Sequence, residues 1–160
     1  MAKASGGVKV HNTRNIDELV SAVLDLHAFL NSPQRDDTLL REARVNLDRA
    51  LFPLLVALGR KGALAVAELA GLVGRDHTTV SRQLAKLESL GMVERCASPE
   101  DRRVRAARLT EAGEGVVRQI TEARRSLLTK VLAGWEAEDV SALARLSRRF
   151  ADTLIGFDRA

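Results

Sequence analysis

Residues 63–110 read ALAVAELAGLVGRDHTTVSRQLAKLESLGMVERCASPEDRRVRAARLT, and this stretch decides the fold of the chain. Its apolar residues recur at helical spacing over about 66–73, and Gly74 follows where a left-handed C-cap is expected. Asp76 is suited to cap a second helix running to about Leu90, because its carboxylate can accept hydrogen bonds from the free N–H groups of the first turn. Two helices joined by so short a turn predict a helix-turn-helix.

The second of these helices has two different faces. Its buried stripe is expected to consist of Val80, Leu84, Leu87 and Leu90. The opposite face carries short hydroxyls and then Arg and Lys about one turn apart, which suits insertion into the major groove of duplex DNA. We expect base-edge contacts from Thr78, Thr79, Ser81 and Arg82, and contacts with the groove rim and phosphates from Gln83 and Lys86. His77, at the helix start, fits either a phosphate contact or an ordinary first-turn residue.

After Gly91 the pattern changes to that of a β-hairpin. One strand begins with Met92-Val93-Glu94-Arg95-Cys96, a turn follows over 98–101, and a second strand covers 103–109. Five arginines fall between Arg95 and Arg108, and arginine at a hairpin tip can enter the narrow, negative minor groove. Two strands alone are marginally stable, so we expect the hairpin to pack on the helices, with Leu64-Ala65 as a third short strand.

The order of these elements, together with three short motifs, resembles the MarR family of transcription regulators. The motifs are Gly91-Met92-Val93-Glu94-Arg95, Asp101-Arg102-Arg103 and Leu109-Thr110-Glu111-Ala112-Gly113. The resemblance covers nearly the whole chain and implies a winged helix-turn-helix in which Arg103 enters the minor groove and Asp101 holds it in place. Arg102 and Arg105 complete the candidate DNA contacts of the wing. Val104 departs from the family, which more often has a small residue at this position.

The resemblance also implies a mode of action. It implies a homodimer on a pseudo-palindromic operator, most often a repressor, with a small aromatic or amphipathic effector bound between the dimer helices and the DNA-binding domain. Nothing in the residues identifies that effector, and His27 and Arg49 are the polar side chains near apolar stripes that are its candidate contacts. For His27 the simpler interpretation is a place at the edge of the core, because a single histidine does not by itself make a binding site.

The rest of the chain predicts flanking helices with long apolar stripes. Expected helices cover about 15–31, 47–58, 111–133 and 137–155, and residues 36–45 form either a short helix or a continuation of the first helix after a bend. Pro53 either starts the regular part of its helix or kinks it. Because the stripes of the first and the last two helices have no partner of their own, we expect a two-fold dimer whose recognition helices lie roughly 34–36 Å apart. A monomer with a small helical bundle is the alternative.

The expected architecture is mainly α with a small β-wing (α+β). Residues 1–14 are expected to form a flexible N-terminal arm, residues 15–46 and 111–160 a helical dimerisation region, and residues 47–110 the DNA-binding domain. The length of 160 residues and an apolar share of 46% suit a globular protein of this size.

The positive charge is concentrated in the predicted DNA-binding module. The chain has a net charge of +4, and residues 75–108 hold eight Lys or Arg against five Asp or Glu. Three of the four excess charges therefore lie in that stretch, as expected of a nucleic-acid binder. No apolar run is long enough to span a bilayer and the start of the chain lacks the pattern of a signal peptide, so we expect a cytoplasmic protein.

Other functions fit the sequence less well. A winged helix that binds only other proteins is the main alternative, although such an interface would not need the arginines of the wing. The sequence contains no Gly-rich phosphate loop, no metal-ligand spacing and no nucleophile–base set, so we expect neither an enzyme nor a bound metal or cofactor. Cys96 is best interpreted as a small half-buried hydrophobe on the first wing strand, since a redox role needs an exposed thiolate.

Overall fold

The computed structural model describes residues 13–98, 101 and 103–157, and these residues form a mainly helical fold with one small sheet. The elements follow in the order α1 (Thr13–Leu30), α2 (Pro33–Glu42), η1 (Arg49–Leu51), α3 (Phe52–Lys61), β1 (Leu64–Ala65), α4 (Val66–Val73), α5 (His77–Ser89), β2 (Val93–Ala97), β3 (Arg105–Leu109), α6 (Glu111–Val131) and α7 (Ala137–Phe157). The predicted fold class is confirmed.

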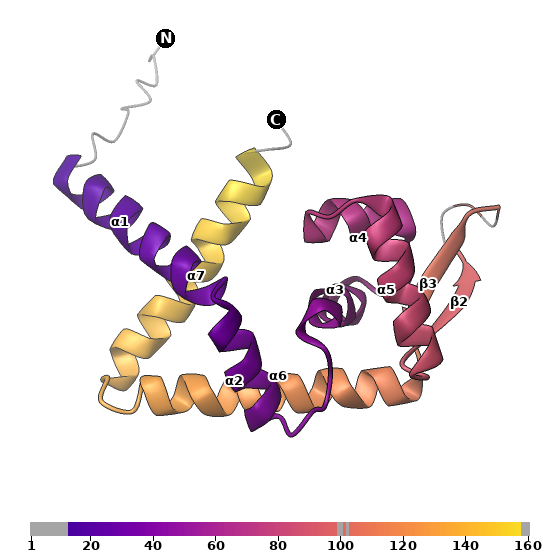
Figure 1. The fold of residues 1–160 in the computed structure, drawn as a ribbon. Coiled ribbons are helices and arrows are strands. Elements are labelled where there is room, and N and C mark those ends of the chain that lie inside the picture. The colour runs from indigo at the N-terminus through magenta and orange to yellow at the C-terminus, as the bar shows by residue number, and fades with distance from the viewer. Residues whose placement is uncertain (1–12, 99–100, 102, 158–160) are drawn as a thin grey trace, which may run out of the picture.

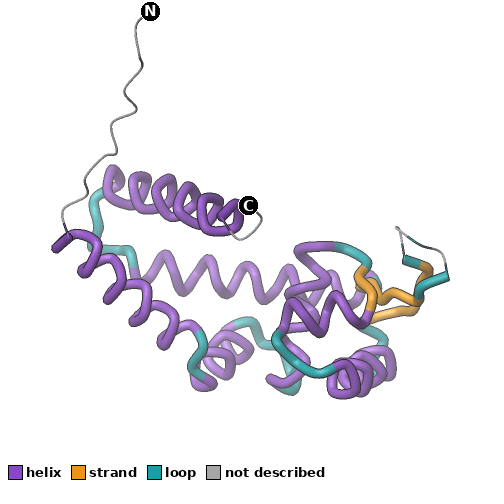
Figure 2. Tube along the Cα trace, turned by 90° about the horizontal axis from the view of Figure 1, so that it is seen from above, coloured by secondary structure: helices purple, strands orange, loops and turns teal. Residues whose placement is uncertain are grey.

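The long helix α6 connects two differently built parts of the molecule. At one end lie α3, α4, α5 and the hairpin of β2 and β3, and we call residues 47–110 the winged-helix region (Figure 1). At the other end α1 and α7 extend away from it, as the view from above also shows (Figure 2). We call α1 and α7 the terminal helices.

Local signals in the sequence place the helices of the winged-helix region. The Asp48 carboxylate accepts a hydrogen bond from the Ala50 N–H at 2.8 Å and so caps η1. Pro53 lies in the first turn of α3, which makes it a helix start and not a kink. Gly74, with φ of 64°, ends α4 in the left-handed conformation that glycine adopts without strain.

The sheet is antiparallel, with β3 in the middle between β1 and β2. Leu64 pairs with Ala107 in the predicted short third strand, and Val93 pairs with Leu109 at the base of the hairpin. The second wing strand starts at Arg105, two residues later than expected. The cause is a turn in which the Val104 N–H donates to the Asp101 carbonyl and the Ser98 N–H donates to the Val104 carbonyl, both at 2.9 Å.

One apolar core joins α2, α3, α4, α5 and the sheet to the middle of α6. Its most enclosed side chains are Leu54, Leu55, Leu58, Leu69, Val80, Leu84, Leu87, Val93 and Ile120. Three of the four residues predicted for the buried stripe of α5 are therefore in the core. The prediction for Leu90 is wrong, since this side chain is 44% exposed. Leu90 is the residue that ends the helix, and it follows the last helical turn instead of lying under it.

The start of α6 is locked against the end of α5. The Thr110 hydroxyl donates to the Gly91 carbonyl at 2.6 Å, and the Thr110 N–H donates to the Met92 carbonyl at 3.1 Å. The same hydroxyl caps α6 by accepting from the Gly113 N–H at 3.2 Å. A Cβ atom at Gly113 would overlap the Met92 carbonyl oxygen, so only glycine allows this close approach.

The terminal helices are packed differently from the core. None of the described side chains of α1 or α7 is buried, although both helices carry the expected apolar stripes. The N-terminal arm was predicted to extend to residue 14, but α1 already includes Thr13 and Arg14; residues 1–12 lie outside the described part of the chain. Within that part, no helix has the length and apolar character needed to cross a membrane.

Candidate nucleic-acid interface

The predicted DNA-facing side of α5 is open to solvent. Thr78, Arg82 and Lys86 are exposed and lie one helical turn apart, while Thr79, Ser81 and Gln83 are half-buried on the flanks of the helix. Ala85 and Ser89 are also exposed and continue the face with small side chains. The helix therefore presents a narrow strip of hydroxyl, guanidinium and ammonium groups, whose donors match the acceptors of base edges and phosphates.

Asp76 holds the first turn of α5 in place. Its carboxylate accepts from the Thr79 N–H at 2.8 Å and from the Thr79 hydroxyl at 2.6 Å. These hydrogen bonds from Thr79 lower the pKa of the Asp76 carboxyl below its usual value. The Thr79 hydroxyl proton is thus directed back to the helix cap, whereas the Thr78 side chain is exposed.

Two side-chain contacts with residues outside the helix fix the flanks of α5. On one side Arg75 donates to the Ala50 carbonyl at 2.6 Å and to Gln83 Oε1 at 2.8 Å. On the other side Arg95 Nε of β2 lies 3.4 Å from Glu88 Oε2. Sequence reasoning missed both contacts, because each joins α5 to a residue that no local spacing rule relates to it.

The wing holds Arg103 in the way that the family resemblance implied. Arg103 Nε and Nη2 each lie 3.2 Å from an Asp101 carboxylate oxygen, and the Arg103 N–H donates to the same carboxylate at 2.9 Å. The side-chain bonds, followed by the backbone bond, lower the pKa of Asp101, so the brace stays ionised at neutral pH. The Arg103 side chain is nevertheless 91% exposed.

Other wing arginines differ in what they contact. Arg105 is exposed, as is Val104 beside it. Arg108 Nε lies 2.6 Å from Glu94 Oε1 across the two strands, which engages this cation within the hairpin. Arg102 lies outside the described residues.

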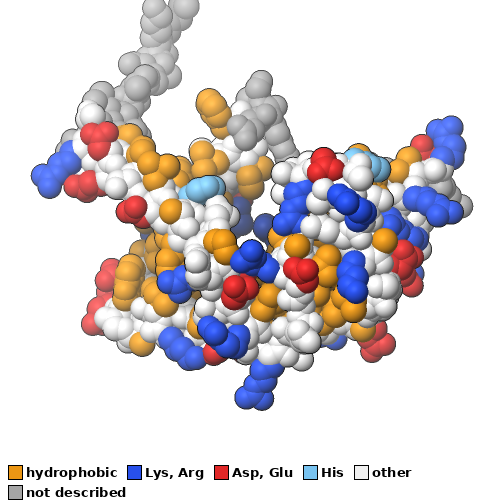
Figure 3. All heavy atoms as spheres, in the orientation of Figure 1, with side chains coloured by type: hydrophobic (Ala, Val, Ile, Leu, Met, Phe, Trp, Pro, Cys, Tyr) orange, Lys and Arg blue, Asp and Glu red, His pale blue; other side chains and the backbone are white. Residues whose placement is uncertain are grey.

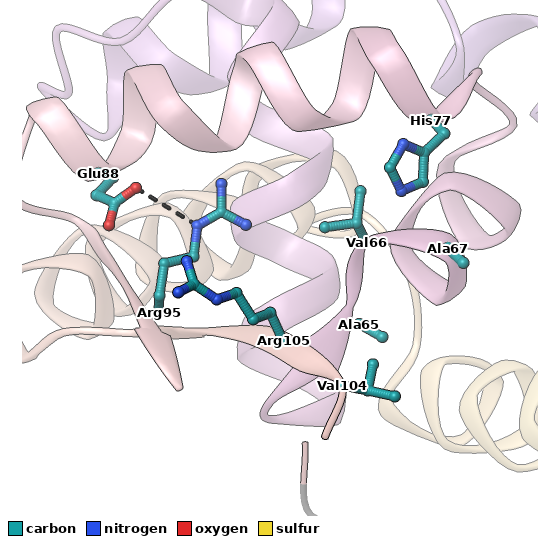
Figure 4. A pocket seen from close by; sticks show the side chains of 8 residues that line it. All are labelled: Ala65, Val66, Ala67, His77, Glu88, Arg95, Val104 and Arg105. Carbon is teal, nitrogen blue, oxygen red and sulfur yellow. Dashed lines mark hydrogen bonds and ion pairs between the residues drawn. The ribbon is translucent and has the colours of Figure 1, made fainter. Parts of the chain in front are cut away.

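A hollow of about 570 Å³ separates α5 from the wing (Figure 4). Its lining residues are Ala65, Val66, Ala67, His77, Glu88, Arg95, Val104 and Arg105. His77 and Glu88 come from opposite ends of α5, and the Arg95–Glu88 pair lies between helix and strand (Figure 4). The exposed His77 side chain is compatible with either interpretation given to it above. Cys96 is half-buried on β2, as expected.

Figure 3 shows the contrast between the two ends of the molecule in one view. Blue Lys and Arg side chains lie over the winged-helix region and at the end of the wing, whereas orange hydrophobic side chains follow α1. His27, on α1, is exposed and lies within hydrogen-bond distance of Asn31 Nδ2 at 3.0 Å, so it is not at the edge of the core of this chain.

A second, polar hollow of about 450 Å³ lies where α2 meets the winged-helix region. It is lined by Asp36, Asp37, Asp48, Arg49, Ala50, Pro53 and Arg75. Arg49, one of the two candidate effector contacts, pairs here with Asp37 at 3.8 Å. Burial raises the pKa of Asp36 above its usual value. Among the described residues, no group of three or more His, Cys, Asp or Glu side chains has the arrangement of a metal site.

Comparisons with known proteins agree with this geometry. A family model described as MarR family matches residues 45–104. The chain is 30% identical over 109 residues to the uncharacterized HTH-type transcriptional regulator YdgJ of Bacillus subtilis (strain 168), a match that covers 66% of this chain and 66% of that protein.

Solved structures extend the similarity to nearly the full chain. A MarR family protein from Bacillus stearothermophilus superposes with a TM-score of 0.76 at 25% identity, over 91% of this chain and 99% of that one. Streptococcus pneumoniae FabT, solved in complex with DNA, shares the fold with a TM-score of 0.59 at 18% identity, over 91% of this chain and 99% of its own. The chain therefore belongs to the MarR family of winged helix-turn-helix transcription regulators.

Proposed function

We propose that this protein binds duplex DNA sequence-specifically, with α5 in the major groove and the wing in the adjacent minor groove. The observation that carries the proposal is the Arg103 brace: Asp101 holds the guanidinium through two hydrogen bonds and the Arg103 backbone N–H through a third, and the side chain is still 91% exposed. A side chain already ordered in this way loses little further conformational freedom when it enters a narrow minor groove. Exposed Thr78, Arg82 and Lys86 supply the groups for the major groove.

In this proposal Thr78, Thr79, Ser81 and Arg82 face base edges, and Gln83 and Lys86 face the rim and phosphates. Arg102, Arg103 and Arg105, with Asp101 as the brace, form the contacts of the wing. A protein that binds DNA in this way would act in the cytoplasm.

The active form is proposed to be a homodimer on a pseudo-palindromic operator. In support, α1 and α7 expose apolar side chains that include Leu24, Leu26, Phe29, Leu143, Leu146, Phe150, Leu154 and Ile155. Exposed apolar area of this extent, arranged along two helices, is typical of an interface and not of a free surface. FabT, which shares this fold, was solved in complex with DNA.

Regulation is proposed to be repression that a small aromatic or amphipathic effector relieves. Binding between the dimerisation region (residues 15–46 and 111–160) and the winged-helix region would change the spacing of the two recognition helices and so release the operator. Arg49 lines a hollow on this boundary, where α2 meets the winged-helix region. His27 lies on α1, outside the residues that line this hollow.

The second candidate function is a winged helix that binds only other proteins. The exposed apolar side chains of the terminal helices favour some protein contact, which the dimer would also explain. Salt dependence separates the two, because neutralisation of phosphates releases counterions and makes DNA binding fall steeply with salt.

The test is selection of duplexes from a random pool at near-physiological salt. We expect an inverted repeat with half-sites about one helical turn apart, bound less tightly as salt rises. An Asp101→Ala variant should bind the enriched duplex more weakly, since Arg103 loses its brace. No enrichment by the wild-type protein, with or without added salt, would contradict the DNA-binding proposal and favour the protein-binding alternative.

A further inference from the structure

Arg75 lies in the turn between α4 and α5, and its guanidinium is directed into the protein. One nitrogen, Nη1, donates to two acceptors that are distant in sequence, the Ala50 carbonyl at 2.6 Å and Gln83 Oε1 at 2.8 Å. The side chain is half-buried. Although Arg75 contributes to the excess of positive charge in this module, its Nη1 atom, with two of the five N–H donors of the guanidinium, is already bonded to protein groups.

The surroundings of Arg75 also keep it away from DNA. It lines the polar hollow of about 450 Å³ together with the carboxylates of Asp36, Asp37 and Asp48. Asp48 caps η1 at the same place and thereby fixes the carbonyl of Ala50 that Arg75 contacts. Attraction to these carboxylates favours the orientation in which the Arg75 guanidinium stays in the hollow over one in which it extends to a DNA phosphate.

The contact defines what Gln83 can do. Because arginine only donates, it must face the Oε1 atom of the Gln83 amide, and the NH₂ end then points elsewhere as a donor. A bidentate contact of glutamine with adenine needs both ends of the amide, whereas a phosphate oxygen only accepts. Gln83 held in this way has one Oε1 lone pair engaged by Arg75 and offers its NH₂ end as a donor, which suits a phosphate oxygen.

The position of Gln83 on α5 agrees with this role. At 100° per residue, Gln83 lies between the buried stripe and the exposed face, on the flank that contacts η1. The opposite flank is fixed by the Glu88–Arg95 pair. The two contacts together restrain rotation of α5 about its axis.

We propose that Arg75 is a positioning residue for DNA recognition, which holds the Gln83 amide as a donor toward the phosphate backbone without contacting DNA itself. The inference rests on the DNA-binding function proposed above. It adds a residue that the sequence motifs of the wing and the recognition helix do not include.

The experiment is a double-mutant cycle on the duplex enriched by selection, with Kd measured over a range of salt concentrations. Arg75→Met keeps the apolar stem and removes the donors, and Gln83→Ala removes the acceptor. We expect each change to weaken binding about tenfold, and the double variant to bind no more than about threefold worse than the weaker single variant. The slope of log K against log salt should stay unchanged in Arg75→Met, since the contact that is weakened is that of the uncharged Gln83 and no cation is lost from a phosphate.

Three further variants serve as controls. Lys86→Met, at an expected phosphate contact, should reduce the salt slope by about 0.9. Arg145→Met removes the same charge from exposed α7 and should leave both affinity and slope unchanged. Arg75→Lys retains a single nitrogen that can donate twice, so it should recover most of the lost affinity. Arg75→Leu also removes the donors and replaces Arg75→Met in the cycle if that variant does not fold.

Two results would overturn the inference while wild-type binding persists. The first is a Kd of the double variant that rises by the product of the two single-variant factors, which would show that Arg75 and Gln83 act independently. The other is a salt slope reduced by about 0.9 in Arg75→Met, which would place Arg75 itself on a phosphate. Wild-type protein that binds no duplex at all would instead overturn the proposed function, and this role with it.

Discussion

The winged-helix region and the terminal helices have the same kind of apolar pattern but bury it to opposite extents. On α5, Val80, Leu84 and Leu87 follow helical spacing and are fully enclosed. On α7, Leu143, Phe150 and Leu154 also follow helical spacing, yet they are 38–51% exposed. Periodicity therefore identifies which face of a helix seeks burial, but it does not tell what covers that face.

The difference implies two sources of stability. The winged-helix region packs its helices on one another and on the sheet, so its core is complete within one chain. The terminal helices add little buried area to that core and are suited to contribute through a second copy. Substitutions in the two parts should accordingly change different measurements.

The largest effect is expected from Leu84→Ala in the core of the winged-helix region. The side chain is 0% exposed, and its truncation leaves a cavity among well-packed neighbours. We expect a loss of about 3 kcal/mol in the free energy of unfolding, measured by urea denaturation. Leu72→Ala, at a residue of α4 that is 54% exposed, is the matched control and should change stability by less than about 0.5 kcal/mol. Equal losses in both variants would contradict the distinction between core and surface.

The next largest loss of stability is expected where α6 joins the winged-helix region. Gly113→Ala places a Cβ against the Met92 carbonyl, so the start of α6 must move away from the end of α5. We expect a loss of about 2–3 kcal/mol on unfolding, as for other overpacked sites. Gly134→Ala, where a Cβ meets nothing within 4 Å, should have little effect. A fully stable Gly113→Ala variant would show that the junction is not rigid.

Much of the winged-helix region could be predicted because its signals are local. Asp76 and Gly74 each act on the nearest helical turn and start or end a helix as predicted, and Pro53 takes the helix start, one of the two roles left open for it. The Asp101–Arg103 brace spans two residues and followed from the family motif. The DNA contacts of these residues stay predictions.

The features that sequence reasoning missed depend on distance or on exact helix ends. Arg75 reaches Ala50 across 25 positions, a pairing that no periodicity reveals. Leu90 fitted the apolar spacing, but α5 ends at Ser89, so the spacing rule no longer applied to it. The late start of β3 results from backbone hydrogen bonds of the turn before Arg105, which the side chains do not encode.

A charge on the apolar face of α7 should weaken the proposed dimer, which tests whether a second copy covers the terminal helices. Phe150→Asp is expected to raise the dimer dissociation constant by about 30-fold, roughly 2 kcal/mol, because a carboxylate resists transfer into an apolar interface. Sedimentation over a concentration series measures this constant. Ser141→Asp introduces the same charge on a different side of α7 and is the control. An unchanged dimer in Phe150→Asp, or a monomeric wild type, would mean that α7 does not form the interface.

The smallest change in stability is expected from Asp36→Asn, at the place where α2 meets the winged-helix region. Burial raises the pKa of Asp36 in the folded chain above its ordinary value of 3.8, so its ionised form is disfavoured by folding. Below pH 3.8 the carboxyl is protonated in both states and Asp36→Asn should match the wild type. As the pH rises past that value the unfolded state ionises first, and wild-type stability falls relative to the variant until the folded pKa is passed.

At pH 7 we therefore expect Asp36→Asn to melt about 1–2 °C higher than the wild type. Asp37→Asn loses an exposed 3.8 Å pair with Arg49 and also the repulsion between Asp37 and Asp36, two small changes of opposite sign, so it should melt like the wild type at both pH values. A lower Tm of Asp36→Asn at pH 7 would mean that the carboxylate is stabilised by its basic neighbours more than it is disfavoured by burial.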